Sequence, residues 1–194
     1  TTRLRQLPDL DLVASAAAEL EEIVAVALGN HVVVDRLTAT SILPERQART
    51  MGTLGYVARA SGVDIDARRD HPFHDLGPGF VPVVETTGDV MARFLVRARE
   101  AQQSAALIAE LTASASGAET GTDAESGPLP SGSGAGLGVV EAWRGTLVHR
   151  VEVRDGLVSR CKVVDPSFFN WPALPVALKD TIVPDFPLTN KSFN

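Results

Sequence analysis

The sequence feature that most constrains the fold is an apolar repeat with the period of an α-helix, which follows Gly88 and Asp89. A Thr or Asp side chain in the segment 86–89 can cap free backbone N–H groups and so begin a helix. The apolar side chains on one helical stripe are Val90, Phe94, Ala98, Ala101, Ala105, Ile108 and Leu111. The polar side chains mostly on other faces are Arg93, Arg97, Arg99, Glu100 and Gln103. The sequence therefore predicts a long amphipathic helix over 90–111.

A second helical repeat occurs near the start of the chain, where apolar side chains recur three and four residues apart over 12–28. Pro8-Asp9 is typical of a helix start and Gly29-Asn30 of a helix end. Both helices carry an apolar stripe that must be buried. We therefore expect the two helices to pack against each other.

The segment between these two helices is less regular. The run from Val32 to Leu37 is rich in β-branched residues and predicts a strand. Pro44, placed as the first residue of a helix and followed by Glu45, predicts a short helix over 44–49. Glycine and proline are so frequent from Gly52 to Pro82 that we expect a loop without regular structure there.

The second half of the chain begins with the segment 114–136, which is rich in Ser, Gly, Ala and Thr and lacks apolar periodicity. We interpret it as a flexible linker or loop. The predicted strands are Val139–Ala142, Thr146–Val153 and Leu157–Val164, with a tight turn at Asp155-Gly156. Asp165-Pro166 ends the sheet, one short helix is predicted over 172–179, and the remainder is interrupted by proline.

These elements predict an α+β fold that is mainly α, with long helices packed together beside a small antiparallel sheet. We divide the chain into a helical part with a Gly/Pro-rich loop (1–113), a linker (114–136), and a β-hairpin with a short C-terminal helix (137–194). The first and last parts are expected to belong to one domain, because 194 residues suffice for one core.

Composition excludes several classes of function. A net charge of -6 gives no general attraction to a nucleic acid, and no Lys/Arg run departs from that average, so nucleic acid is not expected as a partner. A single cysteine, Cys161, excludes an intramolecular disulfide and a multi-thiolate metal site within the chain. The longest apolar stretch, 23–28, is too short to cross a bilayer. We also expect a fragment of a longer polypeptide, since the chain lacks an initiator Met and stops without a cap.

Three local patterns are candidates for chemical sites. His71 and His74 could offer two metal ligands, but Pro72 opposes the helix that would align them, and we favour a structural or solvent-facing role. The glycines of 132–138 suggest a phosphate loop, yet a strand follows them, which favours the linker. Cys161 alternates with apolar residues in a strand and is interpreted as a buried thiol.

Four segments, taken in order, resemble the large subunits of complex I and of the related membrane-bound (group 4) nickel-iron hydrogenases. The first is Gly55–Pro72, with its Arg, Ser-Gly, Asp-x-Arg and Pro pattern, and the second is Gly88–Ser104, where Gly-Asp opens a helix. Glu141-Ala-Trp-Arg-Gly145 is similar to the family's Glu-Ala-Pro-Arg-Gly turn, and 185–194 resembles the approach to its Ser-Phe-Asp-Pro-Cys-x-x-Cys. The resemblance implies the fold of the nickel-hydrogenase large subunit.

The resemblance also implies where a cofactor would be bound. In the hydrogenases two Cys-x-x-Cys pairs hold nickel and iron, and their positions would lie before Thr1 and just after Asn194. This chain contains neither pair. We therefore expect no cofactor in this chain, and a nickel-iron centre only if flanking cysteines exist outside it.

Arg144 is the candidate catalytic residue. The resemblance implies that its guanidinium projects over the metal site, where a fixed cation can stabilise developing negative charge. The alternative is a structural ion pair with Glu141 or Asp185, and both interpretations stay open. Asn194, the second candidate, replaces the family's Asp, and Trp143 replaces its Pro. Both departures favour the complex I-like branch, in which the cavity serves quinone or coupling.

Arg59, Asp66 and Arg68 of the first segment are expected to be structural. The function implied by the resemblance is that of a membrane-associated oxidoreductase subunit passing electrons to quinone or protons. The resemblance also implies a branch with formate hydrogenlyase activity, and the binding of nickel or NAD by the complete protein. The implied partners are an iron-sulfur small subunit and membrane subunits, and the implied location is the cytoplasmic face of the cell membrane. A non-catalytic scaffold of such a complex is the alternative.

Overall fold

The computed structural model describes residues 8–77, 79–115 and 132–194. The helices are α1 (Leu10–Gly29), α2 (His31–Leu37), α3 (Glu45–Met51), α4 (Gly55–Ala60), α5 (Ala67–Asp70), α6 (Val90–Ala115), α7 (Ser167–Asn170), α8 (Leu174–Ala177) and α9 (Phe186–Ser192), with 3-10 turns η1 (Trp171–Ala173) and η2 (Val183–Asp185). The strands β1 (Gly134–Ala142), β2 (Gly145–Arg154) and β3 (Leu157–Val164) form one antiparallel sheet in that order. The predicted α+β class, mainly α with a small sheet, is confirmed.

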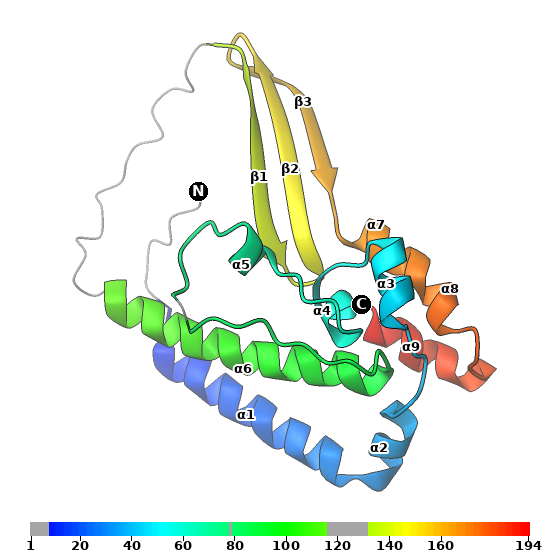
Figure 1. The fold of residues 1–194 in the computed structure, drawn as a ribbon. Coiled ribbons are helices and arrows are strands. Elements are labelled where there is room, and N and C mark those ends of the chain that lie inside the picture. The colour runs from blue at the N-terminus through cyan, green and yellow to red at the C-terminus, as the bar shows by residue number, and fades with distance from the viewer. Residues whose placement is uncertain (1–7, 78, 116–131) are drawn as a thin grey trace.

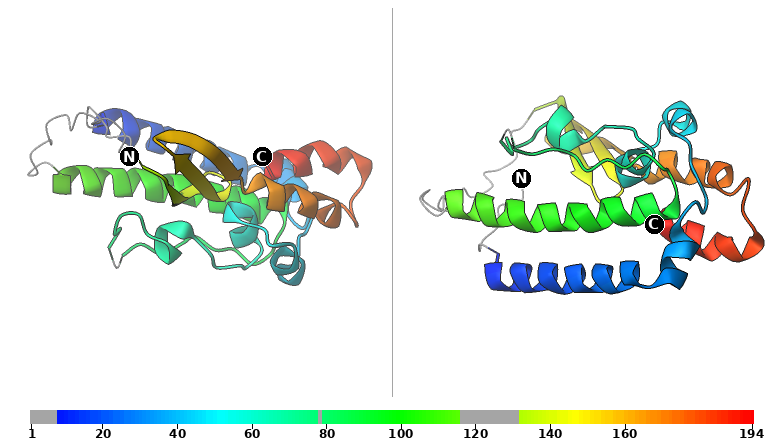
Figure 2. Two further views of the ribbon diagram at one scale, coloured as in Figure 1. Left: turned by 90° about the horizontal axis from the view of Figure 1, so that it is seen from above. Right: turned by 60° about the horizontal axis from the view of Figure 1, so that its bottom comes forward.

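The two long helices α1 and α6 lie side by side and run in opposite directions (Figures 1 and 2). Asp9 caps α1 by accepting from the N–H groups of Asp11 and Leu12, and Asp89 accepts from Ala92 at the start of α6. The Gln102 side chain of α6 donates to the carbonyl oxygen of Ala17 in α1. The predicted pairing of these helices is therefore confirmed.

Helix α6 is buried on two sides, which a single apolar stripe did not predict. One side meets α1, while Ala92, Arg93, Val96 and Glu100 on the other side are buried against the rest of the molecule. Arg93 and Glu100 were predicted to lie off the apolar stripe, and that pattern did not predict that they are buried. These charged side chains can be buried because residues distant in the sequence form ion pairs and hydrogen bonds with them. The helical periodicity of α6 alone does not predict such partners.

Helix α4 lies at the centre of the core, and all six of its residues are buried. Its apolar side chains pack with a cluster that includes Leu43, Val96 and Phe193. The prediction that 52–82 lacks regular structure is therefore wrong, because it contains α4 and α5. Tertiary burial stabilises these short helices, which their sequence pattern does not predict.

The predicted strand over 32–37 is also wrong, because the segment forms α2. Asn30 ends α1, and its side chain accepts from the N–H groups of Val32 and Val33, so the chain starts a new helix at once. This cap overrides the β propensity of three valines. The helix predicted after Pro44 is confirmed, with Pro44 as the N-cap.

The C-terminal segment is more helical than predicted. In place of one helix over 172–179 it forms α7, η1 and α8, and the part expected to be broken by proline forms η2 and α9. The prolines stand at the first or second position of η1, α8, η2 and α9. A proline there removes no helical hydrogen bond, because those N–H groups have no partner within the helix.

The sheet stands away from the helices at its far end (Figure 1). The tight turn there is confirmed by the left-handed backbone of Asp155 and Gly156. The predicted linker over 114–136 is wrong at both of its ends. Ser114 and Ala115 end α6, and residues 134–136 begin β1. Residues 116–131 of the predicted linker lie outside the described residues. Cys161 is exposed on β3, so the prediction of a buried thiol is wrong.

Helix α1 carries many apolar side chains, yet none of its residues is buried. Leu12, Ile23 and Val26 are among its exposed large apolar side chains. Within the described residues, no helix is long and apolar enough to span a bilayer.

Candidate functional site

The candidate site lies where α4, α6 and the β1–β2 hairpin turn meet. Strands β1 and β2 pair up to Ala142 and Gly145, so Trp143 and Arg144 are the two residues of the turn. Gly55 begins α4 directly against this turn. A Cβ on Gly55 would overlap the carbonyl oxygen of Arg144, and its φ of 61° favours glycine. The close approach of two backbones therefore depends on Gly55.

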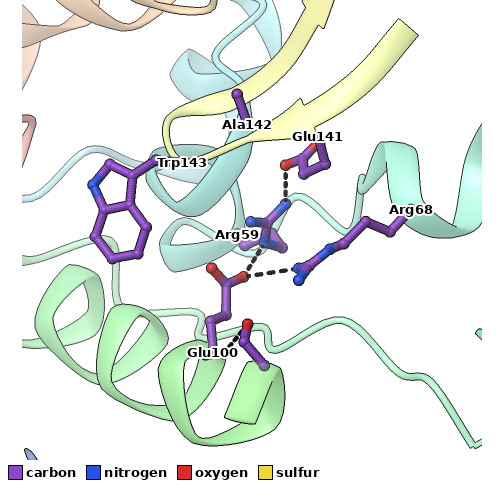
Figure 3. A pocket seen from close by; sticks show the side chains of 7 residues that line it. Arg59, Arg68, Glu100, Glu141, Ala142 and Trp143 are labelled. Atoms are coloured by element: carbon purple, nitrogen blue, oxygen red, sulfur yellow. Dashed lines mark hydrogen bonds and ion pairs between the residues drawn. The ribbon is translucent and has the colours of Figure 1, made fainter. Parts of the chain in front are cut away.

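Arg59 is the centre of a buried ion network, shown in part in Figure 3. Its side chain is 1% exposed, and its Nε donates to Glu100 Oε1 at 2.7 Å. Its Nη1 lies 2.9 Å from Glu141 Oε1 and 3.2 Å from Asp66 Oδ2. Arg68 adds a second cation, with Nη2 2.7 Å from Asp66 Oδ2. We call these five residues the Arg59 cluster.

The Arg59 cluster pairs two guanidinium groups with three carboxylates, so every charged group has a partner of opposite sign and one negative charge is in excess. Burial raises the pKa of Asp66, but the hydrogen bond from Arg68 and the charge of Arg59 outweigh burial and hold that pKa below its usual value. Burial also raises the pKa of Glu100, and here the charges of Arg59 and Arg68 do not fully offset it. The expectation that Arg59, Asp66 and Arg68 are structural agrees with this geometry.

A cavity of about 170 Å³ adjoins the Arg59 cluster and is lined by Arg59, Arg68, Glu100, Ser104, Glu141, Ala142 and Trp143. Sites for drug-sized organic ligands measure about 300–1,000 Å³. This cavity is smaller, and its charged walls are already paired with one another. It fits a structural ion network better than a substrate pocket.

A second group of side chains comes from α4, α6 and the hairpin turn as well. Each of three of its members lies three residues from a member of the Arg59 cluster on the same element. Tyr56 precedes Arg59 on α4, Arg97 precedes Glu100 on α6, and Arg144 follows Glu141 on the hairpin. Arg93 of α6 and Trp143 of the turn complete the group. We call these five residues (Tyr56, Arg93, Arg97, Trp143 and Arg144) the Tyr56 cluster.

The Tyr56 cluster is held together by ring contacts. The Arg97 guanidinium lies 5.3 Å from the centroid of the Tyr56 ring and 5.4 Å from that of Trp143. The two rings are 6.1 Å apart and tilted by 50°. Contacts of this kind contribute about 0.5–2 kcal/mol each, depending on burial. Arg97 is therefore positioned by two aromatic faces.

Arg93 is fully buried and bonds only neutral groups. Its guanidinium donates to Ser192 Oγ and to the carbonyl oxygens of Gly88 and Ser41. Burial lowers the pKa of Arg93 to about 10, with the charge of Asp89 opposing the shift. Arg93 thus ties α6 to α9 and to the segment before α3, and its charge has no directly bonded carboxylate among the described residues.

Arg144 and Asn194, the two predicted site residues, are brought together. The Arg144 guanidinium donates to Asn194 Oδ1. The Arg144 carbonyl oxygen accepts from Asn170, which also accepts from the N–H of Leu54, so the turn is fixed at its backbone. The alternative that Arg144 pairs with Glu141 or Asp185 is wrong. Glu141 pairs with Arg59, and Asp185 pairs with Arg36.

The other predicted patterns do not join the site. His71 and His74 are exposed, as favoured, and line a cavity with Phe73 on the surface. The glycines of 134–138 form part of β1 and are not a phosphate loop. Sequence reasoning missed Tyr56 and the buried role of Arg93. The only signal for Arg93 was its place in the second resembling segment.

The donor atoms of this chain do not fit a nickel-iron centre by themselves. Such a centre needs several soft thiolates, whereas Cys161 is the one cysteine. It lies exposed on β3 opposite Val151, well along the sheet from the turn that carries Arg144. Across residues 8–77, 79–115 and 132–194, no three metal-ligating side chains (His, Cys, Asp or Glu) are grouped to hold an ion.

Comparisons with known proteins agree with this architecture. Residues 10–131 match the family model described as respiratory-chain NADH dehydrogenase, 49 kDa subunit. The chain is 29% identical to the carbon monoxide-induced hydrogenase of Rhodospirillum rubrum over 177 residues, which cover 90% of this chain and 48% of that protein. It is also 29% identical to an NADH-quinone oxidoreductase subunit of Akkermansia muciniphila over 92% of this chain and 50% of that one.

A solved structure has the same fold. It is a chain of the membrane-bound sulfane sulfur reductase, an archaeal respiratory membrane complex, with a TM-score of 0.82 and 26% sequence identity. The match covers 95% of this chain and 52% of that one. This chain therefore spans about half the length of the relatives that it matches along most of its own length.

Proposed function

Because this chain belongs to the family of the 49 kDa subunit of respiratory-chain NADH dehydrogenase, we propose that the complete protein is the large subunit of a membrane-associated oxidoreductase. In this proposal it passes electrons to quinone or to protons within a complex. The contact between Arg144 and Asn194 carries the proposal, because it joins the two site residues from different segments.

Arg144 would act as a fixed cation in this function. Its backbone is held by Asn170 and by the close approach of Gly55, so its guanidinium is positioned before any substrate binds. A preorganised cation stabilises an oxygen atom that gains negative charge during electron transfer. We expect Arg144 to perform this role for the acceptor, and Asn194 to orient its guanidinium.

The experiment is electron transfer by the assembled complex carrying Arg144→Ala. Loss of a preorganised donor lowers kcat by about a hundredfold in comparable sites. The matched control is Arg150→Ala, since Arg150 is an exposed arginine of β2 with a surface ion pair. If the Arg144→Ala complex turned over at the wild-type rate, Arg144 would have only a structural role.

Quinone is preferred over nickel-dependent proton reduction as the acceptor chemistry. The exposed Cys161 and the neutral amide of Asn194 support this choice. Elemental analysis of the complete protein tests it: the complete protein should contain no nickel, and stoichiometric nickel would contradict the choice. Assays of the assembled complex with NADH, formate or hydrogen as donor would separate the branches of the family.

The second candidate function is a non-catalytic structural subunit of the same kind of complex. The fully paired Arg59 cluster favours it, because that network stabilises the fold without an open site. The sequence that follows Asn194 in the complete protein discriminates the two: Pro-Cys-x-x-Cys there would restore the nickel-hydrogenase interpretation.

The proposed partners are an iron-sulfur small subunit and membrane subunits, with the protein on the cytoplasmic face of the cell membrane. The names of the relatives, which include an archaeal respiratory membrane complex, support association with a membrane complex. Co-purification of the complete protein with an iron-sulfur subunit from solubilised membranes tests it. Recovery of the protein alone, free of membranes, would contradict it.

A further inference from the structure

The Tyr56 hydroxyl is the starting point for a further inference. Tyr56 is 0% exposed, and its hydroxyl has no hydrogen-bond partner within the described residues. Buried hydroxyl groups in proteins almost always have such a partner. A polar atom in this state, next to charged side chains, indicates a position for a ligand atom.

The surroundings of this hydroxyl are strongly positive. The charges of Arg97, Arg144 and Arg93 all act on the Tyr56 phenol. Within the described part of the chain, none of these three arginines forms an ion pair with a carboxylate. The neighbouring Arg59 cluster, by contrast, has more carboxylates than arginines. Three cations without a directly paired carboxylate, beside an unpaired donor, favour an anion.

The partner of Arg144 leaves its charge uncompensated. Asn194 accepts the hydrogen bond with a neutral amide oxygen. Among the residues that the structure describes, Arg97 likewise meets only the faces of Tyr56 and Trp143, which leaves the edge of its guanidinium able to donate. Arg97 and Arg144 are half-buried, so a ligand can reach both guanidinium groups from solvent, whereas the Tyr56 hydroxyl is covered in this structure and the surrounding side chains must move for the ligand to accept from it.

We propose that Tyr56, Arg97 and Arg144 form a binding site for a carboxylate group. A carboxylate has a single charge on two oxygens, so it can accept from a guanidinium fork and from the Tyr56 hydroxyl together. Arg93 adds favourable charge from beneath without contacting the ligand. The site does not depend on electron transfer by the complete protein. Its carboxylate comes either from a small molecule or from an acidic side chain of another polypeptide segment.

Acetate binding to the 194-residue chain tests the proposal. Trp143 and Trp171 are the two tryptophans, so a Trp171→Phe background leaves Trp143 as the fluorescence reporter at the site. Sodium acetate should change its emission saturably, and sodium chloride at the same ionic strength should not. Tyr56→Phe fills the same volume and should weaken acetate binding about tenfold, because one hydrogen bond to a charged group is lost.

Two further variants sharpen the result. Asn194→Asp places a carboxylate beside Arg144 and should also weaken acetate binding. Arg99→Gln removes an exposed arginine of α6 that pairs with Glu85, and it should leave binding unchanged. The absence of a saturable response, or equal affinity in the Tyr56→Phe chain, would overturn the proposal.

Radiolabelled acetate distinguishes the two sources of the carboxylate. If the natural ligand is a small molecule, the complete assembly should bind acetate as the isolated chain does, and Arg144→Gln should abolish it. If an acidic side chain of another segment fills the site, the assembly should not bind acetate while the isolated chain does. Binding by the assembly that survives Arg144→Gln would contradict the site.

Discussion

The Arg59 cluster and the Tyr56 cluster are built by the same three elements, yet they use arginine in opposite ways. In the first, two arginines meet three carboxylates, and every charged group has a partner of opposite sign inside the core. In the second, three arginines meet aromatic rings, carbonyl oxygens and amides. About one turn of α4 and of α6 therefore separates the Arg59 cluster, a structural ion network, from the Tyr56 cluster, a proposed binding site.

The energetic consequence differs in the same way. Removal of an arginine from the Arg59 cluster leaves buried carboxylates without a counter-charge, which is costly. Removal of Arg97 or Arg144 from the Tyr56 cluster leaves no directly paired carboxylate behind and relieves repulsion between cations. The first cluster should therefore determine stability, and the second should determine binding.

The largest expected effect is that of Arg59→Met. It should lower the free energy of unfolding by about 3–5 kcal/mol, because three buried carboxylates lose their shared partner. Urea denaturation measures the loss. The control is Arg49→Met, which breaks an exposed pair with Glu45 and should cost less than about 1 kcal/mol. Equal losses in the two variants would remove the distinction between the clusters.

Gly55→Ala tests the joint that holds both clusters in place. The added Cβ would overlap the Arg144 carbonyl oxygen at a residue with positive φ, so we expect a loss of about 2 kcal/mol or more. Thermal unfolding measures it. Gly29→Ala is the matched control, because nothing lies within 4 Å of a Cβ there and its φ is ordinary. A neutral Gly55→Ala would contradict the close approach.

Arg97→Gln should have a smaller effect on stability. It removes two cation–π contacts of about 0.5–1 kcal/mol each and at the same time relieves repulsion from Arg93 and Arg144. The net change in the free energy of unfolding should stay within about 1 kcal/mol. A urea-denaturation loss as large as that of Arg59→Met would mean that Arg97 has a buried counter-charge.

The smallest expected effect is a pH dependence that belongs to the Arg59 cluster. The lowered pKa of Asp66 means that the unfolded chain binds more protons near pH 4, so stability should fall as pH drops through and below that range. Glu100 acts in the opposite sense, since its raised pKa makes stability fall as pH rises through its titration. Asp66→Asn should therefore flatten the acid limb of the stability profile. If the loss of stability at acid pH is the same in Asp66→Asn as in the wild type, other carboxylates cause it.

The sequence predicted the parts of the fold that local chemistry determines. The helices that became α1 and α6, the Asp155-Gly156 turn and the family resemblance are confirmed. It failed where tertiary burial decides. Helix α4 is stable because its whole surface is covered, and Cys161 is exposed because the far end of the sheet leaves the helices.

The candidate site was predictable only in part. The resemblance placed Arg144 and Asn194 as related residues, and the structure brings them into contact. For Tyr56 the only signal was its place in the first resembling segment, because its importance comes from a hydroxyl left unpaired by the packing of α4 against α6 and the hairpin. Single-sequence patterns do not record which buried polar atoms lack partners.

The most direct test of the central contrast is a spectrophotometric titration of tyrosine, because Tyr56 is the single tyrosine of the chain. Burial raises the pKa of Tyr56 above its ordinary value of 10.0, while the nearby arginines hold it down. Tyrosinate absorbance should therefore develop above pH 10, and Arg97→Gln should move its midpoint higher while Arg99→Gln leaves it unchanged. A midpoint at 10 that Arg97→Gln does not move would contradict the account of a buried phenol among uncompensated arginines.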